Sequence, residues 1–180
     1  MKGPIKTDIW SYWGVADALC ITTNGSLKAN GELVMGRGIA LEAAQRFPGM
    51  SFHLGRQVRE GGNKVRVVNG TTVPLGIPTA LVAFPTKLGD VRNIPDDINR
   101  VLPQFRKGLR PGQRIPGWQL YSSLPLIIAS LKELSELAEE HNWDSVVLPP
   151  PGVGNGGLDF NQVVELAHEH LDDRFTMVYK

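Results

Sequence analysis

The sequence predicts an α/β fold in which helices cover a central sheet. Short apolar segments alternate along the chain with segments whose apolar residues recur at helical spacing, and this alternation is typical of a layered α/β domain. Glycine-rich loops follow two of the expected strands, at residues 35–38 and 152–157. In such folds ligands bind outside the carboxyl ends of the strands, so we expect a ligand site between these loops.

The first strand and the first helix are expected near the N-terminus. Ala16 to Thr23 is a nearly continuous apolar run closed by Asn24-Gly25, which is typical of a strand buried on both faces and ended by a turn. Gly36 to Phe47 has apolar residues four positions apart and is followed by Pro48-Gly49. This segment predicts a helix that opens on glycines and stops at the proline.

A hairpin and a further strand are expected next. Lys64 to Val68 and Thr71 to Val73 flank Asn69-Gly70, which is a strong hairpin signal. Ala80 to Phe84 is an apolar run that predicts another strand. Residues 88–120 contain repeated prolines, and their charges have no clear period, so no element is predicted there.

The C-terminal part contains the most regular pattern. From Ser123 to His141, leucine, isoleucine and alanine recur at helical spacing while glutamate and lysine occupy the other face, which predicts an amphipathic helix. A last helix is expected to run through Leu171, with Asp159 and Gln162 as a capping box at its start. Strands are expected at Asp144–Leu148 and Phe175–Tyr179.

Composition limits the class of protein. The 180 residues are enough for one domain with a sizeable core, so we expect a single domain over residues 1–180. The formal net charge is +1, so no strong non-specific binding of nucleic acid is expected and any polyanion must bind locally. Cys20 is the only cysteine, which excludes internal disulfides and cysteine zinc clusters. Without an apolar signal core or a run of ~20 apolar residues, we expect a cytoplasmic protein with no membrane partner.

Both glycine loops suit an anionic ligand. Met35-Gly36-Arg37-Gly38 leads into a helix, whose first N–H groups are unpaired and carry a partial positive charge. Gly152 to Gly157 also lies between a strand and a helix, and glycine lets a phosphate approach the backbone. Two such loops at one sheet edge fit a diphosphate better than a single phosphate. Neither has P-loop or G-x-G-x-x-G spacing, which argues against kinases, NTPases and ordinary dehydrogenases.

The motifs resemble those of the macrodomains, which bind ADP-ribose, over nearly the whole chain. The resemblance rests on Asp8-Ile9, C-I-T-T-N (Cys20 to Asn24), M-G-R-G-I-A-L (Met35 to Leu41) and P-P-P-G-V-G-N-G-G-L-D-F (Pro149 to Phe160). It implies a three-layer α/β/α fold with a central mixed sheet. The residues that it implies for binding ADP-ribose are Asp8, Ile9, Thr23, Met35, Gly36, Arg37, Gly38, Ile39, Thr86, Gly152, Val153, Gly154, Asn155, Gly156, Gly157 and Leu158.

The motif F-P-T-K (Phe84 to Lys87) is similar to that of one subgroup, the DarG-type DNA ADP-ribosyl glycohydrolases and the terminal ADP-ribose protein glycohydrolases. That subgroup has an essential lysine here, so the resemblance implies that Lys87 and Asn24 are catalytic and face the anomeric carbon of the distal ribose. A desolvated lysine beside cations has a lowered pKa and can act as a nucleophile or proton shuttle. Nearby phosphates oppose that shift, so a protonated, electrostatic role stays open.

The acceptor and the reaction are left open. Gly156 stands where protein-directed glycohydrolases carry a catalytic aspartate, and Leu88-Gly89-Asp90 replaces the aromatic and basic residues of the antitoxins. The ligand is therefore expected to be ADP-ribose itself or an ADP-ribosylated protein or nucleic acid. The alternatives to hydrolysis are removal of phosphate from ADP-ribose 1″-phosphate, non-catalytic recognition of ADP-ribose, and a structural protein whose glycine loops are ordinary turns. No cofactor or metal is predicted, because His168 and His170 point to different faces of a helix.

Overall fold

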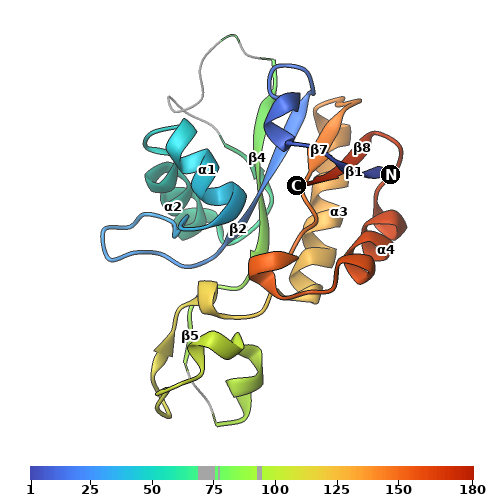
Figure 1. The fold of residues 1–180 in the computed structure, drawn as a ribbon. Coiled ribbons are helices and arrows are strands. Elements are labelled where there is room, and N and C mark those ends of the chain that lie inside the picture. The colour runs from blue at the N-terminus through green and yellow to red at the C-terminus, as the bar shows by residue number, and fades with distance from the viewer. Residues whose placement is uncertain (69–75, 77, 93–94) are drawn as a thin grey trace.

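The computed structural model describes residues 1–68, 76, 78–92 and 95–180, and this part of the chain contains a six-stranded sheet in the order β1-β8-β7-β2-β4-β3 (Figure 1). Neighbouring strands are parallel, except that β3 is antiparallel to β4. The carboxyl ends of the five parallel strands therefore lie at one edge of the sheet. The strands are β1 (Lys2–Lys6), β2 (Ala18–Asn24), β3 (Arg66–Val67), β4 (Ala80–Lys87), β7 (Val146–Leu148) and β8 (Phe175–Tyr179).

Helices cover both faces of the sheet (Figure 1). The helices are α1 (Gly38–Arg46) and α2 (Met50–Gly61) on one face, and α3 (Leu124–Glu140) and α4 (Phe160–His170) on the other. In β2, Leu19 and Ile21 belong to the core with α1 and α2, whereas Ala18 and Cys20 belong to the core with α3 and α4. Because successive strand side chains point to opposite faces, this apolar run needs a cover on both sides. The expected α/β/α layering around a mixed sheet is confirmed.

The elements expected in the C-terminal part are confirmed. α3 begins after Ser123, whose hydroxyl accepts a hydrogen bond from the Leu126 N–H at 3.4 Å, and it is followed by His141. Asp159 caps α4 by accepting a hydrogen bond from the Gln162 N–H at 3.0 Å, which is one half of the expected capping box. β7 lies inside its expected range and β8 has the expected bounds.

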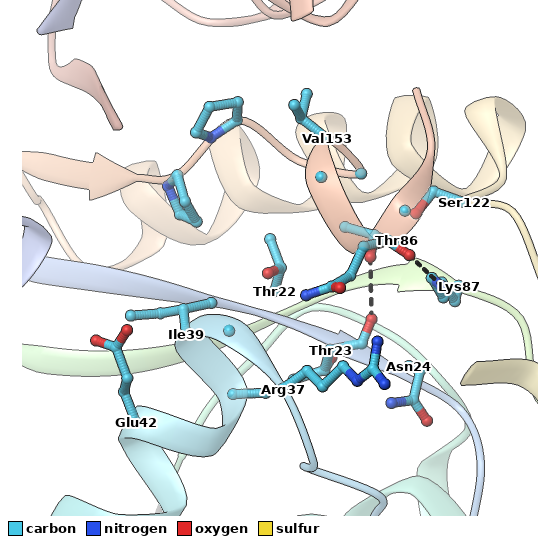
Figure 2. Close-up of a pocket in the computed structure, with 18 of the residues that line it drawn as sticks. Thr22, Thr23, Asn24, Arg37, Ile39, Glu42, Thr86, Lys87, Ser122 and Val153 are labelled. Carbon is cyan, nitrogen blue, oxygen red and sulfur yellow. Dashed lines mark hydrogen bonds between the residues drawn. The ribbon is translucent and has the colours of Figure 1, made fainter. Parts of the chain in front are cut away.

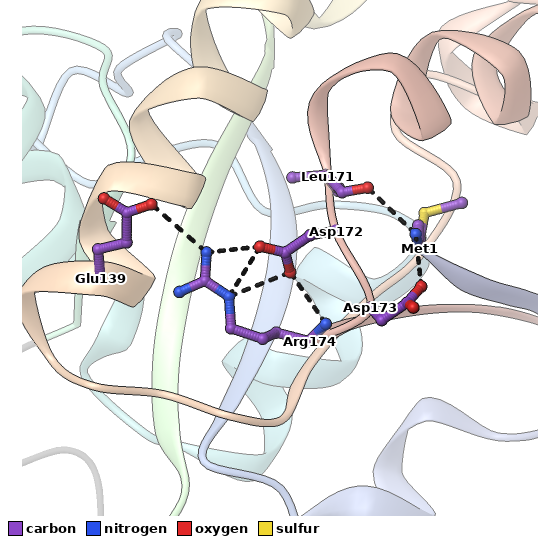
Figure 3. A network of polar contacts seen from close by, with 6 residues as sticks. All are labelled: Met1, Glu139, Leu171, Asp172, Asp173 and Arg174. Carbon is purple, nitrogen blue, oxygen red and sulfur yellow. Dashed lines mark hydrogen bonds and ion pairs between the residues drawn. The ribbon is translucent and has the colours of Figure 1, made fainter.

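A polar network ties the turn before β8 to its neighbours (Figure 3). The Arg174 guanidinium contacts Asp172 at 2.7 Å and Glu139 of α3 at 3.5 Å. The Met1 amino group donates to the Leu171 carbonyl at 3.1 Å, beside the parallel pairing of β1 with β8. Exposed ion pairs contribute little to stability, so the pairing of β1 with β8 rests mainly on the backbone ladder between them.

The expected hairpin is only partly visible. Arg66–Val67 is a strand, and it pairs antiparallel with β4, with Val67 opposite Val82. The expected turn Asn69-Gly70 and the expected strand Thr71–Val73 lie outside the described residues.

One strand and one α-helix of the main layers, β1 and α2, have no counterpart in the sequence-based predictions. β1 is exposed along its whole length and has no alternating pattern, because it is an edge strand ordered by pairing with β8. α2 starts directly after Pro48-Gly49, which was expected only to end the first helix. Gly49 has a φ of +87°, so it turns the chain between two helices.

No element is predicted in residues 88–120. Those of them that the structure describes, 88–92 and 95–120, form a lobe beside the main sheet (Figure 1). The described part of the lobe contains a two-stranded sheet of β5 (Val91–Arg92) and β6 (Arg114–Ile115), and short 3-10 turns connect the rest. Its small core consists of Val101, Ile115 and Leu120. Each strand has two residues, which is too short to produce a readable period in the sequence.

Substitution of Gly55, in the middle of α2, tests how this helix packs. Alanine normally stabilises a helix by ~1 kcal/mol relative to glycine. Here a Cβ would overlap the Gly31 carbonyl oxygen and lie 2.8 Å from the Leu33 nitrogen. We expect Gly55→Ala to lower the free energy of unfolding by about 2 kcal/mol, measured by urea denaturation. Gly61→Ala is the control, because its Cβ meets only the flexible guanidinium of Arg66; equal effects of the two substitutions would contradict this packing.

Candidate functional site

A cavity of about 660 Å³ opens at the sheet edge where the parallel strands end (Figure 2). Its walls come from the ends of β2, β4 and β8, the start of α1 and the loop after β7. Asn24, Thr86 and Lys87 lie together at one end, and Glu42 lies at the other (Figure 2). A cavity of this size is within the usual range for small-molecule sites.

The first glycine loop presents unpaired backbone to this cavity. Gly36, Arg37 and Gly38 line it and are exposed. The residue before α1 is Arg37, whose side chain makes no capping hydrogen bond. The first N–H groups of α1 therefore have no side-chain cap, which suits an anion.

The second glycine loop has a backbone that only glycine adopts readily. Gly152, Gly154 and Gly157 have φ values of +84°, +65° and +75°, a region that side chains disfavour. At Gly156 the restriction is space, since a Cβ would overlap the Ser122 hydroxyl. The loop is therefore close to its neighbours, and four of its six residues are glycines without a side chain that could block a phosphate.

Lys87 ends β4 and is 8% exposed. Its Nζ donates hydrogen bonds to the carbonyl oxygens of Trp118 at 3.0 Å and Asn155 at 2.7 Å. Burial, followed by the charge of Arg37, lowers the pKa of Lys87 to about 8. These two hydrogen bonds use two N–H groups of the nitrogen. The neutral amine then still has a lone pair, and the ammonium still has a third N–H group.

Asn24 holds the loop after β2. Its amide nitrogen donates to the Val34 carbonyl at 2.8 Å, and its amide oxygen accepts from the Ser26 N–H at 2.8 Å. This is the hydrogen-bonding pattern of an asparagine turn. Nearby, the Thr86 hydroxyl donates to the Thr23 carbonyl at 3.2 Å and joins β4 to β2 (Figure 2). Asn24 thus lies in the cavity wall with its amide bound to backbone.

The opposite end of the cavity contains a cluster of charges. Glu42 accepts a hydrogen bond from the Trp10 indole N–H at 2.6 Å and pairs with Lys180 at 3.2 Å. Lys180 also lies 3.5 Å from Asp8, which accepts a hydrogen bond from the Trp10 backbone. Ile9 lines the cavity beside this cluster.

Fourteen of the expected site residues lie together in the cavity wall. They are Ile9, Thr23, Asn24, Gly36, Arg37, Gly38, Ile39, Thr86, Lys87, Gly152, Val153, Gly154, Asn155 and Gly156. Four others do not line it: Asp8 caps the first turn after β1, Met35 is buried in the core, Gly157 lies against the Tyr121 ring, and Leu158 packs beneath α3 and α4.

Sequence reasoning missed several residues of the cavity wall. Among them, Trp118 comes from the lobe for which no element is predicted, and Glu42 and Lys180 have no motif that distinguishes them from surface charges. Ser122 is also missed. Its hydroxyl is buried and has no hydrogen-bond partner within the described residues, so the site contains an unsatisfied polar atom.

No group of three or more His, Cys, Asp or Glu side chains among the described residues is arranged to hold a metal ion. None of the helices in that part of the chain is long and apolar enough to cross a membrane.

Comparison with known proteins gives the same fold. No protein-family model matches the chain. The chain is 31% identical over 152 residues to the DNA ADP-ribosyl glycohydrolase of Mycobacterium tuberculosis, a match that covers 81% of this chain and 35% of that protein. The solved macrodomain of M. tuberculosis DarG has 27% identity and a TM-score of 0.67, and the match covers 100% of this chain and 98% of that one. Thermosipho africanus DarTG in complex with ADP-ribose has 17% identity and a TM-score of 0.61, with 91% of this chain and 38% of that one covered.

The sheet order, the two glycine loops at one sheet edge and these matches define the chain as a macrodomain. Within that class it is a DarG-like macrodomain. The chain spans about a third of the length of the curated relatives that it matches.

The buried amine of Lys87 makes stability depend on pH in a definite direction. Its pKa is about 8 in the folded protein and 10.5 in the unfolded chain, so between these values the unfolded state binds more protons and rising pH favours the folded state. Lys87→Met removes this contribution. The quantity to measure is the free energy of unfolding of the wild type minus that of Lys87→Met, each from urea denaturation. We expect this difference to increase as the pH rises from 8 to 10.5. A difference that does not change with pH would contradict the lowered pKa.

Proposed function

We propose that this macrodomain, over residues 1–180, is a hydrolase that removes ADP-ribose from a modified macromolecule. The observation that carries the proposal is the buried Lys87 amine, with a pKa of about 8, at one end of a cavity between two glycine loops. The curated relatives are named DNA ADP-ribosyl glycohydrolases, and a structural neighbour is a complex with ADP-ribose. The first name supports the reaction class, and the second supports ADP-ribose as the ligand.

In the proposed complex, the diphosphate lies between the two glycine loops. Their N–H groups supply the binding, so a chain with a net charge of +1 can hold a dianion. The adenosine occupies the end near Ile9, and the distal ribose occupies the end near Lys87. A ligand oxygen near Gly156 would give the Ser122 hydroxyl the partner that it lacks among the described residues.

Lys87 is the proposed catalytic group, and its two possible protonation states have opposite pH dependences. The neutral amine attacks the anomeric carbon, the electron pair of the ribosyl bond passes to the acceptor, which takes up a proton, and water then frees ADP-ribose and regenerates the amine. The ammonium instead donates a proton to the leaving acceptor while water attacks. The first role gives a rate that rises with pH through the pKa of Lys87, and the second gives a rate that falls.

Substitution of Lys87 tests the proposed chemistry. We expect Lys87→Met to lower the single-turnover rate on ADP-ribosylated DNA by about 10³-fold or more. ADP-ribose affinity, measured by calorimetry, should fall much less than the rate, because Lys87 contacts only the Asn155 carbonyl of the second loop and the N–H groups of both glycine loops remain. Lys132→Met, on the exposed face of α3, is the matched control.

The outcomes of that assay separate the competing functions. Full activity of Lys87→Met would contradict the proposal. Phosphate release from ADP-ribose 1″-phosphate without cleavage of any conjugate would favour the phosphatase. Tight ADP-ribose binding without turnover of any substrate by the wild type would favour a reader.

Arg37 provides a second test, because its charge lowers the pKa of Lys87. Removing that charge raises the pKa, so the pH at which the rate changes should move upward in Arg37→Gln. The measurement is the pH dependence of the single-turnover rate at saturating enzyme. Arg37→Lys keeps the charge and should leave the pH profile near that of the wild type. An unshifted profile in Arg37→Gln would show that the charge of Arg37 does not set the pKa of the catalytic group.

A further inference from the structure

The cavity wall contains a carboxylate that the sequence motifs do not explain. Among the described residues that line the cavity, the acidic side chain is that of Glu42. Asp8, which the motifs imply for binding ADP-ribose, does not line it. A carboxylate repels a diphosphate, so the presence of Glu42 in this wall calls for another partner in the ligand.

The position of Glu42 indicates which part of the ligand it faces. Glu42 lies four residues after Gly38, the first residue of α1. Residues four apart share one face of a helix and are about 6 Å apart along its axis. Both residues line the cavity, and Glu42 and Ile39 lie at the end away from Lys87 (Figure 2). With the diphosphate at Gly38, the adenosine is the part of the ligand that reaches Glu42.

The carboxylate of Glu42 is held in place before any ligand binds. The Trp10 indole N–H donates to its Oε2 at 2.6 Å. The indole ring is itself packed, since the Arg46 guanidinium lies 4.5 Å from its centroid and the Phe47 ring centroid lies 6.2 Å away. A group fixed in this way costs little ordering entropy when it binds a ligand.

Glu42 retains the capacity to accept a further hydrogen bond. Its Oε1 accepts from the Lys180 amine at 3.2 Å, and a carboxylate oxygen has two acceptor sites. The same amine lies 3.2 Å from Oε2 and offsets the charge that would repel the diphosphate. Glu42 and Lys180 thus present an acceptor beside a donor. Adenine has the complementary arrangement, an amino donor beside a ring-nitrogen acceptor.

The surroundings of Glu42 favour the base over the ribose as its partner. Ile9, Ile39 and Val178 line the cavity, and Ile9 and Val178 are buried. A purine has apolar faces and a polar edge, so it can lie on these side chains while its edge meets a carboxylate. A ribose carries its hydroxyl groups on a ring without such faces.

Asp8 is engaged elsewhere. Its Oδ1 accepts a hydrogen bond from the backbone N–H of Trp10 at 3.1 Å and caps the turn Ile9–Tyr12. The same oxygen lies 3.5 Å from the Lys180 amine. Asp8 is therefore connected to the cavity through Lys180.

We propose that Glu42 determines the base specificity of this cavity by accepting a hydrogen bond from the exocyclic amino group of adenine. Trp10 and Lys180 hold its carboxylate in place, and Asp8 acts only by positioning Lys180. This inference rests on the proposed function, because it takes the bound ligand to be ADP-ribose.

The test compares two ligands by calorimetry. One is ADP-ribose, and the other is an analogue with purine in place of adenine, which lacks only the 6-amino group. We expect the wild type to bind ADP-ribose on the order of tenfold more tightly than the analogue, as for a hydrogen bond to a charged group. Glu42→Ala should bind the two ligands with nearly equal affinity. Asp8→Asn is the matched control and should keep the wild-type preference.

The ratio of the two affinities separates recognition from a packing effect. A general disturbance of the cavity in Glu42→Ala weakens both ligands equally and leaves the ratio unchanged. Glu42→Gln keeps the size of the side chain and an oxygen that can accept from Trp10. Its ratio should also fall, because a neutral amide is a weaker acceptor than a carboxylate.

The outcomes distinguish this inference from the proposed function. Equal binding of the two ligands by the wild type, or an undiminished preference in both Glu42 variants, would overturn the role of Glu42. Loss of the preference in Asp8→Asn would assign the amino group to Asp8 and would also overturn it. The expected ratios without hydrolysis of any conjugate would overturn the proposed hydrolase and leave the role of Glu42 intact. No binding of ADP-ribose by the wild type would overturn both.

Discussion

The hydrogen bonds of the Lys87 amine are the interaction on which the geometry of the site depends. They join the end of β4 to Trp118 in the lobe and to Asn155 in the second glycine loop, three segments that are far apart in the sequence. Both acceptors are main-chain carbonyls, so the side chain at position 87 alone supplies the donors. Burying this amine also lowers its pKa to about 8. The contact that joins these three segments is therefore made by an amine whose pKa lies close to neutral pH.

The pKa of Lys87 is lowered in a cavity with little negative charge near the amine. Among the described residues that line the cavity, the acidic side chain is Glu42, which lies at the far end and is bound to Trp10 and Lys180 (Figure 2). A side chain at position 156 would have to displace the Ser122 hydroxyl, because a Cβ there would overlap its oxygen. Burial and the charge of Arg37 act on Lys87 without an opposing carboxylate in that wall. A bound diphosphate would raise the pKa of Lys87, so ligand binding and protonation of Lys87 are coupled.

The sequence predicted those parts of the fold and site that depend on local signals. The amphipathic period of α3, the cap at Asp159 and the apolar run of β2 each lie within one short segment, and each is confirmed. β1 was missed because it is ordered by pairing with β8. α2 has a local signal, since Met50, Leu54 and Val58 recur four positions apart, and it was missed because Pro48-Gly49 was interpreted only as the end of the first helix. The lobe was missed because its two-residue strands have no period of their own.

By itself, the sequence determined that two glycine loops follow strands of an α/β fold and that a lysine ends one of those strands. These features follow from the conformational freedom of glycine and from hydrophobic periodicity, both of which act over a few residues. Only the tertiary structure decided that Trp118, Ser122 and Lys180 join this site and that the amide of Asn24 is bound to backbone. The physical reason is that parallel strands bring the loops after them to one sheet edge, where residues more than 100 positions apart come into contact.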